Sequence, residues 1–281
     1  MRIAADEIKT MGVLVGEWVA RGGDAVVMGV TSKGIYLRFP GDWIGFLTLA
    51  DYRSPFTVNM LNETTLDLRL GDQVEFAALG WQQRVWAPPQ FPPPFAPEIL
   101  SKQAVSLARQ AAKTETTDGL LPYIPYLGGL EDPCPPEGAF TSRLKPFLSV
   151  EMAKGGWIER FELLSAFLGQ GRGLTPSGDD FAAGFLLAAV RLFRAADLPG
   201  FVDGLPAFLA RARVKTTYLS ATMLYGAAAG LADERLIAMS DCLADPAADL
   251  AGVVAGLRTY GSTSGLDALA GCLAAVRIFG G

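Results

Sequence analysis

The hydrophobic positions divide the chain into a front part with strand-like patterns and a back part with helix-like patterns. Between residues 13 and 87, β-branched and aromatic residues alternate or cluster in short runs separated by Gly, Asp and Pro turns. The runs are VLVGEWVA, DAVVMGVT, GIYLRFP, WIGFLTLA, FTVNML, LDLRLGDQVEFAAL and QRVWA. Several short strands at this spacing predict an antiparallel sheet of the barrel or sandwich type.

A proline-rich stretch follows the predicted strands. Residues 88–97 read PPQFPPPFAP, and six prolines in ten positions exclude regular hydrogen-bonded structure. The embedded Phe91 and Phe95 favour a segment that packs along the protein surface over a proline-rich recognition segment. We therefore expect a domain boundary here.

Helical periodicity dominates the rest of the chain. A helix is expected from about residue 98 to residue 113, and the helices of the C-terminal half are rich in Ala and Gly, which let helices approach one another closely. The predicted fold class is α+β. It comprises an antiparallel β-rich domain (residues 1–87), a Pro-rich linker with one helix (88–140) and an α-helical bundle domain (141–281).

Composition and charge narrow the range of partners. The net charge of −5 argues against a nucleic-acid-binding face, which needs clustered Lys and Arg. The longest apolar helical run, residues 181–190, stops well short of the ~20 residues of a membrane span. The N-terminal stretch, with Asp6 and Glu7 before a short apolar run, does not read as a signal peptide. We expect a soluble cytoplasmic protein that binds neither nucleic acid nor membrane.

The chain contains no histidine, which excludes Ser/His/Asp and Cys/His triads and His-ligated metal sites. Cys134, Cys242 and Cys272 are widely spaced and indicate neither a disulfide framework nor a zinc cluster. Proton transfer would therefore depend on carboxylates, Lys, Tyr, Cys or the substrate itself. No cofactor is expected.

One loop at the start of an apolar helix concentrates unusual residues. Residues 169–180 read GQGRGLTPSGDD, and glycines at 169, 171 and 173 allow positive φ angles and close approach of a ligand to the main chain. The helix start adds unpaired amides and a positive dipole end. This junction predicts a pocket for phosphate or a carboxylate. The loop lacks the Gly-Lys-Ser/Thr ending of a P-loop and the spacing of a dinucleotide fingerprint.

Two other helix starts carry related residues. SGDDFAAG at residues 177–184 recurs in altered form as SGLDALAG at 264–271, which suggests an internal duplication. A third start follows Lys215, where Thr216 or Thr217 is a candidate cap. Helix capping alone would explain the Ser and Asp of the second start, but it explains neither the three glycines nor the paired Asp residues of the first.

Convergence of the three helix starts would surround one small anionic ligand. The ligand-binding residues predicted on this basis are Gly169, Gly171, Gly173, Thr175, Ser177, Gly178, Lys215, Thr216, Thr217, Thr263, Ser264 and Asp267.

Asp179 and Asp180 have three possible uses. They suit acid/base work at a shifted pKa, Mg²⁺ binding, or contact with an amide or ammonium group of a substrate. Successive helical positions point about 100° apart, so only one of the two readily faces a pocket. We expect a division of labour between them, and no metal in the site.

The combination GxGxGLTPSGDDFxAG, a TTxLSAxML segment and a GxTSGxDxLAG segment resembles a bacterial family that includes the AllH-type subunit of oxamate carbamoyltransferase. The resemblance covers roughly residues 140–280, and LTPSGDD is its specific part. Ser262 stands where relatives are expected to have histidine, and the Ser-Thr-Arg-Thr phosphate loop of ordinary transcarbamoylases is absent.

The resemblance implies phosphorolysis of oxalurate to oxamate and carbamoyl phosphate, together with partner subunits, in anaerobic allantoin degradation, a branch of purine catabolism. Arg172 and Lys215 would then hold phosphate or carboxylate, the loop amides would stabilise oxyanion charge, and Asp179 or Asp180 would orient the carbamoyl nitrogen. The predicted catalytic residues are Arg172, Asp179 and Asp180. The alternative is a non-catalytic metabolite-binding or scaffold subunit of a multi-protein complex.

Overall fold

The computed structural model describes residues 1–61, 66–77, 79–114, 118–130, 135, 137–149 and 156–280. Cys134 and part of the predicted linker lie outside these residues. The chain divides into two compact units. The first comprises Met1–Pro89 with Leu231–Glu234, and the second comprises Gln90–Gly230 with Arg235–Gly281.

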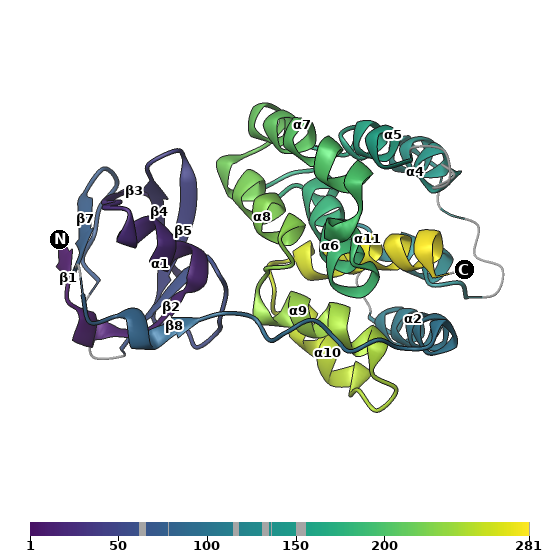
Figure 1. Ribbon diagram of the computed structural model, residues 1–281, viewed down its shortest axis with the longest axis horizontal. Coiled ribbons are helices and arrows are strands. Elements are labelled where there is room, and N and C mark those ends of the chain that lie inside the picture. The colour runs from purple at the N-terminus through teal and green to yellow at the C-terminus, as the bar shows by residue number, and fades with distance from the viewer. Residues whose placement is uncertain are drawn as a thin grey trace. The chain divides into compact units, whose positions relative to one another are not determined.

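The first unit contains an eight-stranded sheet in the order β1-β7-β3-β4-β5-β6-β2-β8, which curls into a half-barrel (Figure 1). Its strands are β1 (Arg2–Ile3), β2 (Ile8–Gly12), β3 (Ala25–Thr31), β4 (Gly34–Phe39), β5 (Trp43–Thr48), β6 (Thr57–Met60), β7 (Gln73–Phe76) and β8 (Val85–Trp86). The inward residues Leu37, Leu47 and Val74 are almost wholly buried and form part of its core.

The prediction of an antiparallel sheet is wrong for three of the seven strand pairings. β1 pairs with β7, β5 with β6, and β2 with β8 in parallel, whereas the other four pairs are antiparallel. β5 and β6 are parallel because residues 49–56 cross over instead of forming a hairpin. The side-chain amide of Asn59 holds this connection by donating to the carbonyls of Ala50 and Tyr52, each at 2.7 Å.

The run VLVGEWVA, predicted as a strand, is instead helix α1 (Val13–Ala20). Its buried side chains follow helical spacing, with Leu14 and Val15 one turn before Trp18 and Val19. The Trp18 ring packs against Trp43 with the ring centroids 5.9 Å apart. Packing against the sheet therefore outweighs the strand preference of the valines.

The second unit is helical. Its elements are α2 (Pro97–Ala111), α3 (Ile124–Leu127), α4 (Ala139–Ser149), α5 (Gly156–Leu164), α6 (Ser177–Phe193), α7 (Pro199–Lys215), α8 (Tyr218–Ala228), α9 (Glu234–Asp241), α10 (Leu250–Arg258) and α11 (Ser264–Phe279). The helix predicted near residues 98–113 is confirmed as α2. Among the described residues, no helix has both the length and the apolar character needed to cross a membrane.

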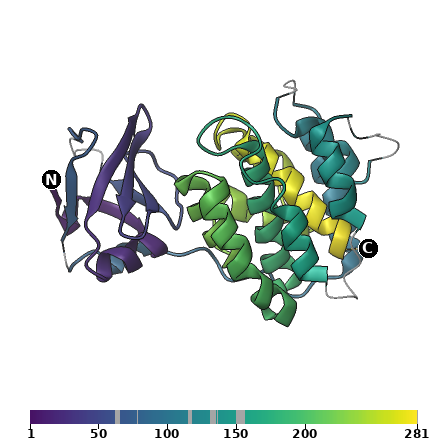
Figure 2. The same cartoon turned by 90° about the horizontal axis from the view of Figure 1, so that it is seen from above.

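Helices α6 and α11 lie side by side in the interior of this unit (Figures 1 and 2). Every residue from Gly178 to Leu192 of α6 and from Ser264 to Val276 of α11 is buried. A helix that is buried on all sides needs apolar or small residues around its whole circumference, which explains the Ala-rich sequences.

Glycines allow these two helices to cross at very short distance. A Cβ atom placed on Gly184 would lie 1.9 Å from the Ala268 carbonyl oxygen, and one placed on Gly271 would lie 1.9 Å from the Phe181 carbonyl oxygen. Neither position tolerates a side chain unless the helices move apart.

We predict that Gly184→Ala destabilises the protein by about 1–3 kcal/mol, because the added methyl group overpacks the helix crossing. Unfolding by denaturant, followed by circular dichroism, measures the change. Gly256→Ala in α10 is the matched control, since the nearest atom to its added Cβ is Arg235 Cγ at 3.8 Å. The control should be neutral or stabilising by about 0.5–1 kcal/mol. Equal effects of the two substitutions would contradict the role assigned to the crossing.

Candidate functional site

The loop before α6 has a backbone shape that requires glycine. Gly169, Gly171 and Gly173 have φ angles of 72°, 125° and 93°. A Cβ on Gly169 would lie 2.5 Å from the Lys215 carbonyl oxygen, and a Cβ on Gly171 would lie 2.7 Å from the Ser177 nitrogen. Gly173 faces open space, so only its φ angle favours glycine there.

The amides of this loop fall into two groups. Those of Gly169 and Gln170 donate to the Asp179 carboxyl and the Phe167 carbonyl. Within the described part of the chain, the amides of residues 171–175 and of Ser177 donate no hydrogen bond, and residues 171–174 are exposed. The unpaired amides therefore lie mainly in the loop, since the amides of residues 178–180 at the helix start donate to the Gln170 and Pro176 carbonyls. Such a run of unpaired amides before a helix suits an anion.

Helix capping does not explain the two serines of the repeated motif. The N-cap of α6 is Pro176 and that of α11 is Thr263, and neither has a side-chain cap hydrogen bond. The Ser264 hydroxyl instead lies 3.0 Å from the Thr175 hydroxyl. At the third helix start, Thr217 is a true N-cap and accepts a hydrogen bond from the Ser220 amide at 3.0 Å.

Hydrogen bonds bring the three helix starts together around the loop. The Thr175 and Ser264 hydroxyls join the loop to α11, and the Thr217 hydroxyl joins it to α8 by donating to the Leu174 carbonyl at 2.6 Å. Figure 2 shows the loops that precede α6 and α11 side by side at one end of the two helices. Residues about 90 positions apart in the sequence therefore surround one place in the structure.

Asp179 fixes the shape of the loop. Its Oδ1 accepts the Gly169 amide at 2.8 Å, and its Oδ2 accepts the Thr216 hydroxyl. Burial raises the pKa of this carboxyl, while hydrogen bonds from Thr216, Gly169 and Ser220 act to lower it. Because both oxygens accept hydrogen bonds from the protein, Asp179 holds the loop in place.

Asp180 and Asp267 are buried, with 2% and 0% of their surface exposed, and the Oδ2 atom of each has no hydrogen-bond partner among the residues that the structure describes. Burial raises the pKa of Asp180 well above the ordinary value, and the Asp267 charge raises it further. Burial also raises the pKa of Asp267, whose Oδ1 accepts the Leu120 amide at 2.6 Å. An unpaired buried carboxyl oxygen costs about 1–3 kcal/mol, so these two atoms call for a partner that the described residues do not supply.

Sequence analysis missed two contributors to this cluster. Ser220 is 1% exposed and interacts with Asp179; its position one helical turn after Thr217 was the available signal. The Leu120 amide holds Asp267 from a distant segment, next to Gly119 with a φ angle of 64°. No periodicity in the sequence connects Leu120 to the site.

The two predicted basic residues do not lie over the carboxyl groups. The Lys215 ammonium donates to the Ser165 carbonyl at 3.2 Å, although the Lys215 main chain lies against Gly169. Arg172 is exposed on the loop, and no hydrogen bond or ion pair within the described residues engages its side chain. Of these two cations, Arg172 is the one left available to a ligand.

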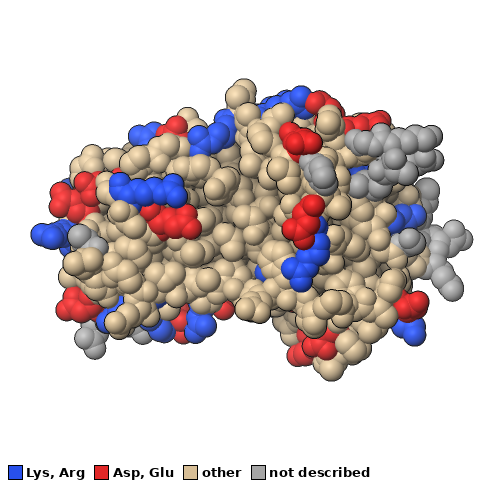
Figure 3. Space-filling view, viewed as in Figure 1, with Lys and Arg blue, Asp and Glu red and all other residues tan. Residues whose placement is uncertain are grey.

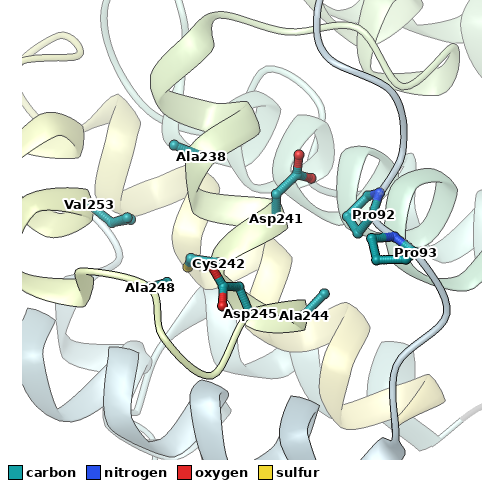
Figure 4. A pocket seen from close by; sticks show the side chains of 9 residues that line it. All are labelled: Pro92, Pro93, Ala238, Asp241, Cys242, Ala244, Asp245, Ala248 and Val253. Atoms are coloured by element: carbon teal, nitrogen blue, oxygen red, sulfur yellow. The ribbon is translucent and has the colours of Figure 1, made fainter.

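A pocket elsewhere in the second unit has a different character. It has a volume of about 560 Å³ and is lined by Pro92, Pro93, Ala238, Asp241, Cys242, Ala244, Asp245, Ala248 and Val253 (Figure 4). None of these lining residues is basic, and two carry carboxylates, so the pocket does not suit an anion. It contains none of the predicted site residues.

Two further observations concern charge. Among the described residues, no group of three or more His, Cys, Asp and Glu side chains is arranged to hold a metal ion. On the face shown in Figure 3, Lys and Arg side chains lie among Asp and Glu rather than in one broad basic patch.

The raised pKa of Asp180 leads to a prediction about stability and pH. As the pH rises above the ordinary value of 3.8, the unfolded chain releases this proton while the native state retains it. The native state then binds more protons, and the free energy of unfolding falls with rising pH. Asp180→Asn removes this penalty, so its free energy of unfolding relative to wild type should increase as the pH rises above the ordinary value of 3.8. Denaturant titrations at a series of pH values measure this difference in the free energy of unfolding. Asp203→Asn, at an exposed position, is the control. A constant difference for Asp180→Asn would contradict the prediction.

The region that contains the candidate site matches a known protein family. Residues 167–276 match the family described as "Oxamate carbamoyltransferase subunit AllH". No curated protein and no solved structure matches the chain. The matched residues include the glycine loop and all three helix starts, and they confirm the resemblance to the AllH family over this region.

Proposed function

We propose that this protein is an enzyme, or a subunit of one, that binds a small anionic carbamoyl or carboxylate compound and takes part in carbamoyl transfer to or from phosphate. The observation that carries the proposal is that, among the described residues, the amides of residues 171–175 and the buried Oδ2 of Asp180 have no partner, while the Thr175 side chain at the end of that run interacts with Asp180. The match to a carbamoyltransferase subunit supports the same class of chemistry.

The site offers acceptors and donors that suit such a ligand. The loop amides and Arg172 supply positive potential for a phosphate or carboxylate group and for oxyanion charge that develops during transfer. Asp180 supplies an acceptor for the N–H group of a carbamoyl nitrogen. Asp179 acts as a positioning residue, because it joins the loop at Gly169 to Thr216.

The proposed reaction needs no histidine. In the direction of phosphorolysis, a phosphate oxygen attacks the carbamoyl carbon of oxalurate, the bond from that carbon to the oxamate nitrogen breaks, and this nitrogen takes up a proton. A carboxyl group whose pKa is raised by burial, as at Asp180, is suited to donate that proton and to accept it in the reverse direction.

A second candidate is a non-catalytic subunit that binds a metabolite or holds partner chains together. It is favoured by the placement of the two predicted basic side chains, since the Lys215 ammonium is bound to a carbonyl and Arg172 is exposed. This candidate predicts saturable ligand binding without turnover.

We predict that Asp180→Asn lowers the rate of carbamoyl transfer by about 100-fold or more, because the site loses both its proton carrier and its acceptor. The assay mixes the protein, together with any subunits that co-purify with it, with oxamate and carbamoyl phosphate, and follows phosphate release. Arg172→Ala should also lower the rate, by weakening the hold on the anion.

Asp203→Asn is the control for this assay and should retain wild-type rates. Full activity in both the Asp180→Asn and the Arg172→Ala enzymes would remove these residues from the site. Binding of oxamate by the wild-type protein without any phosphate release would establish the non-catalytic alternative instead.

A second prediction concerns the loop amides. Gly171→Ala should weaken the binding of inorganic phosphate by about tenfold or more, because the added Cβ would lie 2.7 Å from the Ser177 nitrogen and force the loop to change shape. Isothermal titration calorimetry with phosphate measures the affinity. Gly71→Ala is the matched control, since Gly71 also has a positive φ angle, of 90°, but has open space around it and lies in the other unit. Unchanged phosphate binding by Gly171→Ala would exclude the loop amides as the anion site.

A further inference from the structure

The starts of α6 and α11 carry a repeated sequence, and their contacts with each other are reciprocal, as a local twofold axis would require. Aligning Ser177 with Ser264 pairs Asp180 with Asp267 and Gly184 with Gly271. If the two segments are related by a twofold axis, each contact from one helix to the other must have a counterpart in the opposite direction.

The helix crossing satisfies this condition. Gly184 approaches the Ala268 carbonyl and Gly271 approaches the Phe181 carbonyl, with the same Cβ-to-oxygen distance of 1.9 Å. Residues 181 and 268 are equivalent in the repeat, since each follows its serine by four positions. Equivalent residues of the repeat therefore make both contacts, one in each direction.

The entries into the two helices also correspond. The Pro176 carbonyl accepts the amides of residues 179 and 180, and the Thr263 carbonyl accepts those of residues 266 and 267. A Cβ on Gly178 would lie 2.0 Å from a carbonyl oxygen of the preceding segment, at Phe167, and a Cβ on Gly265 would lie 2.1 Å from one at Leu257.

The polar side chains between the helices also interact reciprocally, with the serine of each helix against the aspartate of the other. The Ser264 hydroxyl of α11 interacts with the Asp180 carboxyl of α6, and the Ser177 hydroxyl of α6 interacts with the Asp267 carboxyl of α11. Each carboxyl retains one buried Oδ2 atom without a partner in the described part of the chain. The two helices thus present one acceptor atom each from corresponding residues, although the Leu120 amide, which binds Asp267 Oδ1, lies outside the repeat.

We propose that Asp180 Oδ2 and Asp267 Oδ2 form one subsite for the terminal NH₂ group of a primary carbamoyl or amide compound, with one N–H bond donated to each oxygen. An NH₂ group has two equivalent donors related by a twofold axis along its C–N bond, which matches two acceptor atoms from corresponding residues. This inference rests on the proposed function and makes Asp267 an equal partner of Asp180 in it.

The loops before the two helices differ, and this difference sets the direction of the ligand. The segment before α6 contains the exposed glycine loop with its five consecutive free amides at residues 171–175, whereas α11 is preceded by the short turn at residues 261–263. The NH₂ group lies between the carboxyls, and the anionic end of the ligand points to the glycine loop. The site therefore selects compounds that carry both groups.

Oxamate and oxalate form a matched pair of probes, because oxalate has a second carboxylate in place of the carboxamide. Calorimetric titrations of the whole protein should give tighter binding of oxamate than of oxalate. Asp180→Asn and Asp267→Asn should each reduce the affinity for oxamate by about tenfold, the effect of losing one hydrogen bond, with less change for oxalate. Ser177→Ala should also reduce the affinity for oxamate, by less than Asp267→Asn does. Ser264→Ala should likewise reduce it by less than Asp180→Asn does.

Asp203→Asn is the control, and circular dichroism shows whether each variant is folded. If the Asp267→Asn protein does not fold, Ser177→Ala alone tests that side of the pair. Equal affinities of the wild type for oxamate and oxalate, no binding of either, or loss of selectivity in the Asp180 variant alone would overturn the inference. Preserved selectivity for oxamate without carbamoyl transfer would support the subsite while refuting catalysis.

Discussion

The close crossing of α6 and α11 is the constraint on which the candidate site depends. Gly184 and Gly271 let the two backbones approach to a distance that no side chain permits. This approach brings the starts of both helices together, so that the carboxyls of Asp180 and Asp267 lie close enough for one charge to raise the pKa of the other. A wider crossing would admit water between them and reduce that effect, because the interaction between charges weakens as the local dielectric constant rises.

Each end of α6 has a buried charged residue, but the surroundings of the two residues are opposite in character. Near its C-terminal end, Arg191 is 1% exposed, and its guanidinium binds both oxygens of Asp241 at 2.7 and 2.6 Å. At its N-terminal end, no cation of the described residues acts on the buried Asp180, and none of these residues binds its Oδ2 atom. Since the same helix contains a fully compensated buried charge, the uncompensated pair is a local property of the site. Buried charged groups without compensating partners are typical of binding and catalytic sites, where a ligand completes the interactions.

The sequence predicted the glycine loop, the helix starts at residues 177 and 264, and Thr217 as a candidate cap, because these features depend on local backbone chemistry. The division of labour between Asp179 and Asp180 stays a prediction, although the structure shows that Asp179 binds Gly169 and Thr216. Sequence reasoning failed for α1, where contacts with the sheet override the preference of valine for strands. It also failed for the three parallel strand pairs, since pairing direction depends on the path of the connections and leaves little signal in the strands themselves.

The role of Asp267 shows where sequence reasoning ends. Capping explained this residue adequately by itself, and only the contact between helices reveals that it shares an environment with Asp180. The repeat explains the pair of carboxyls, because each of its two helix starts supplies one acceptor. The loops that precede the two helices lie outside the repeat and differ from each other. A symmetric pair of carboxyls can hold a symmetric group, and an asymmetric loop can bind an anion on one side only. A ligand with an NH₂ group at one end and a negative charge at the other satisfies both parts of the site at once, which is why the carboxyl pair and the glycine loop are best understood as one binding site.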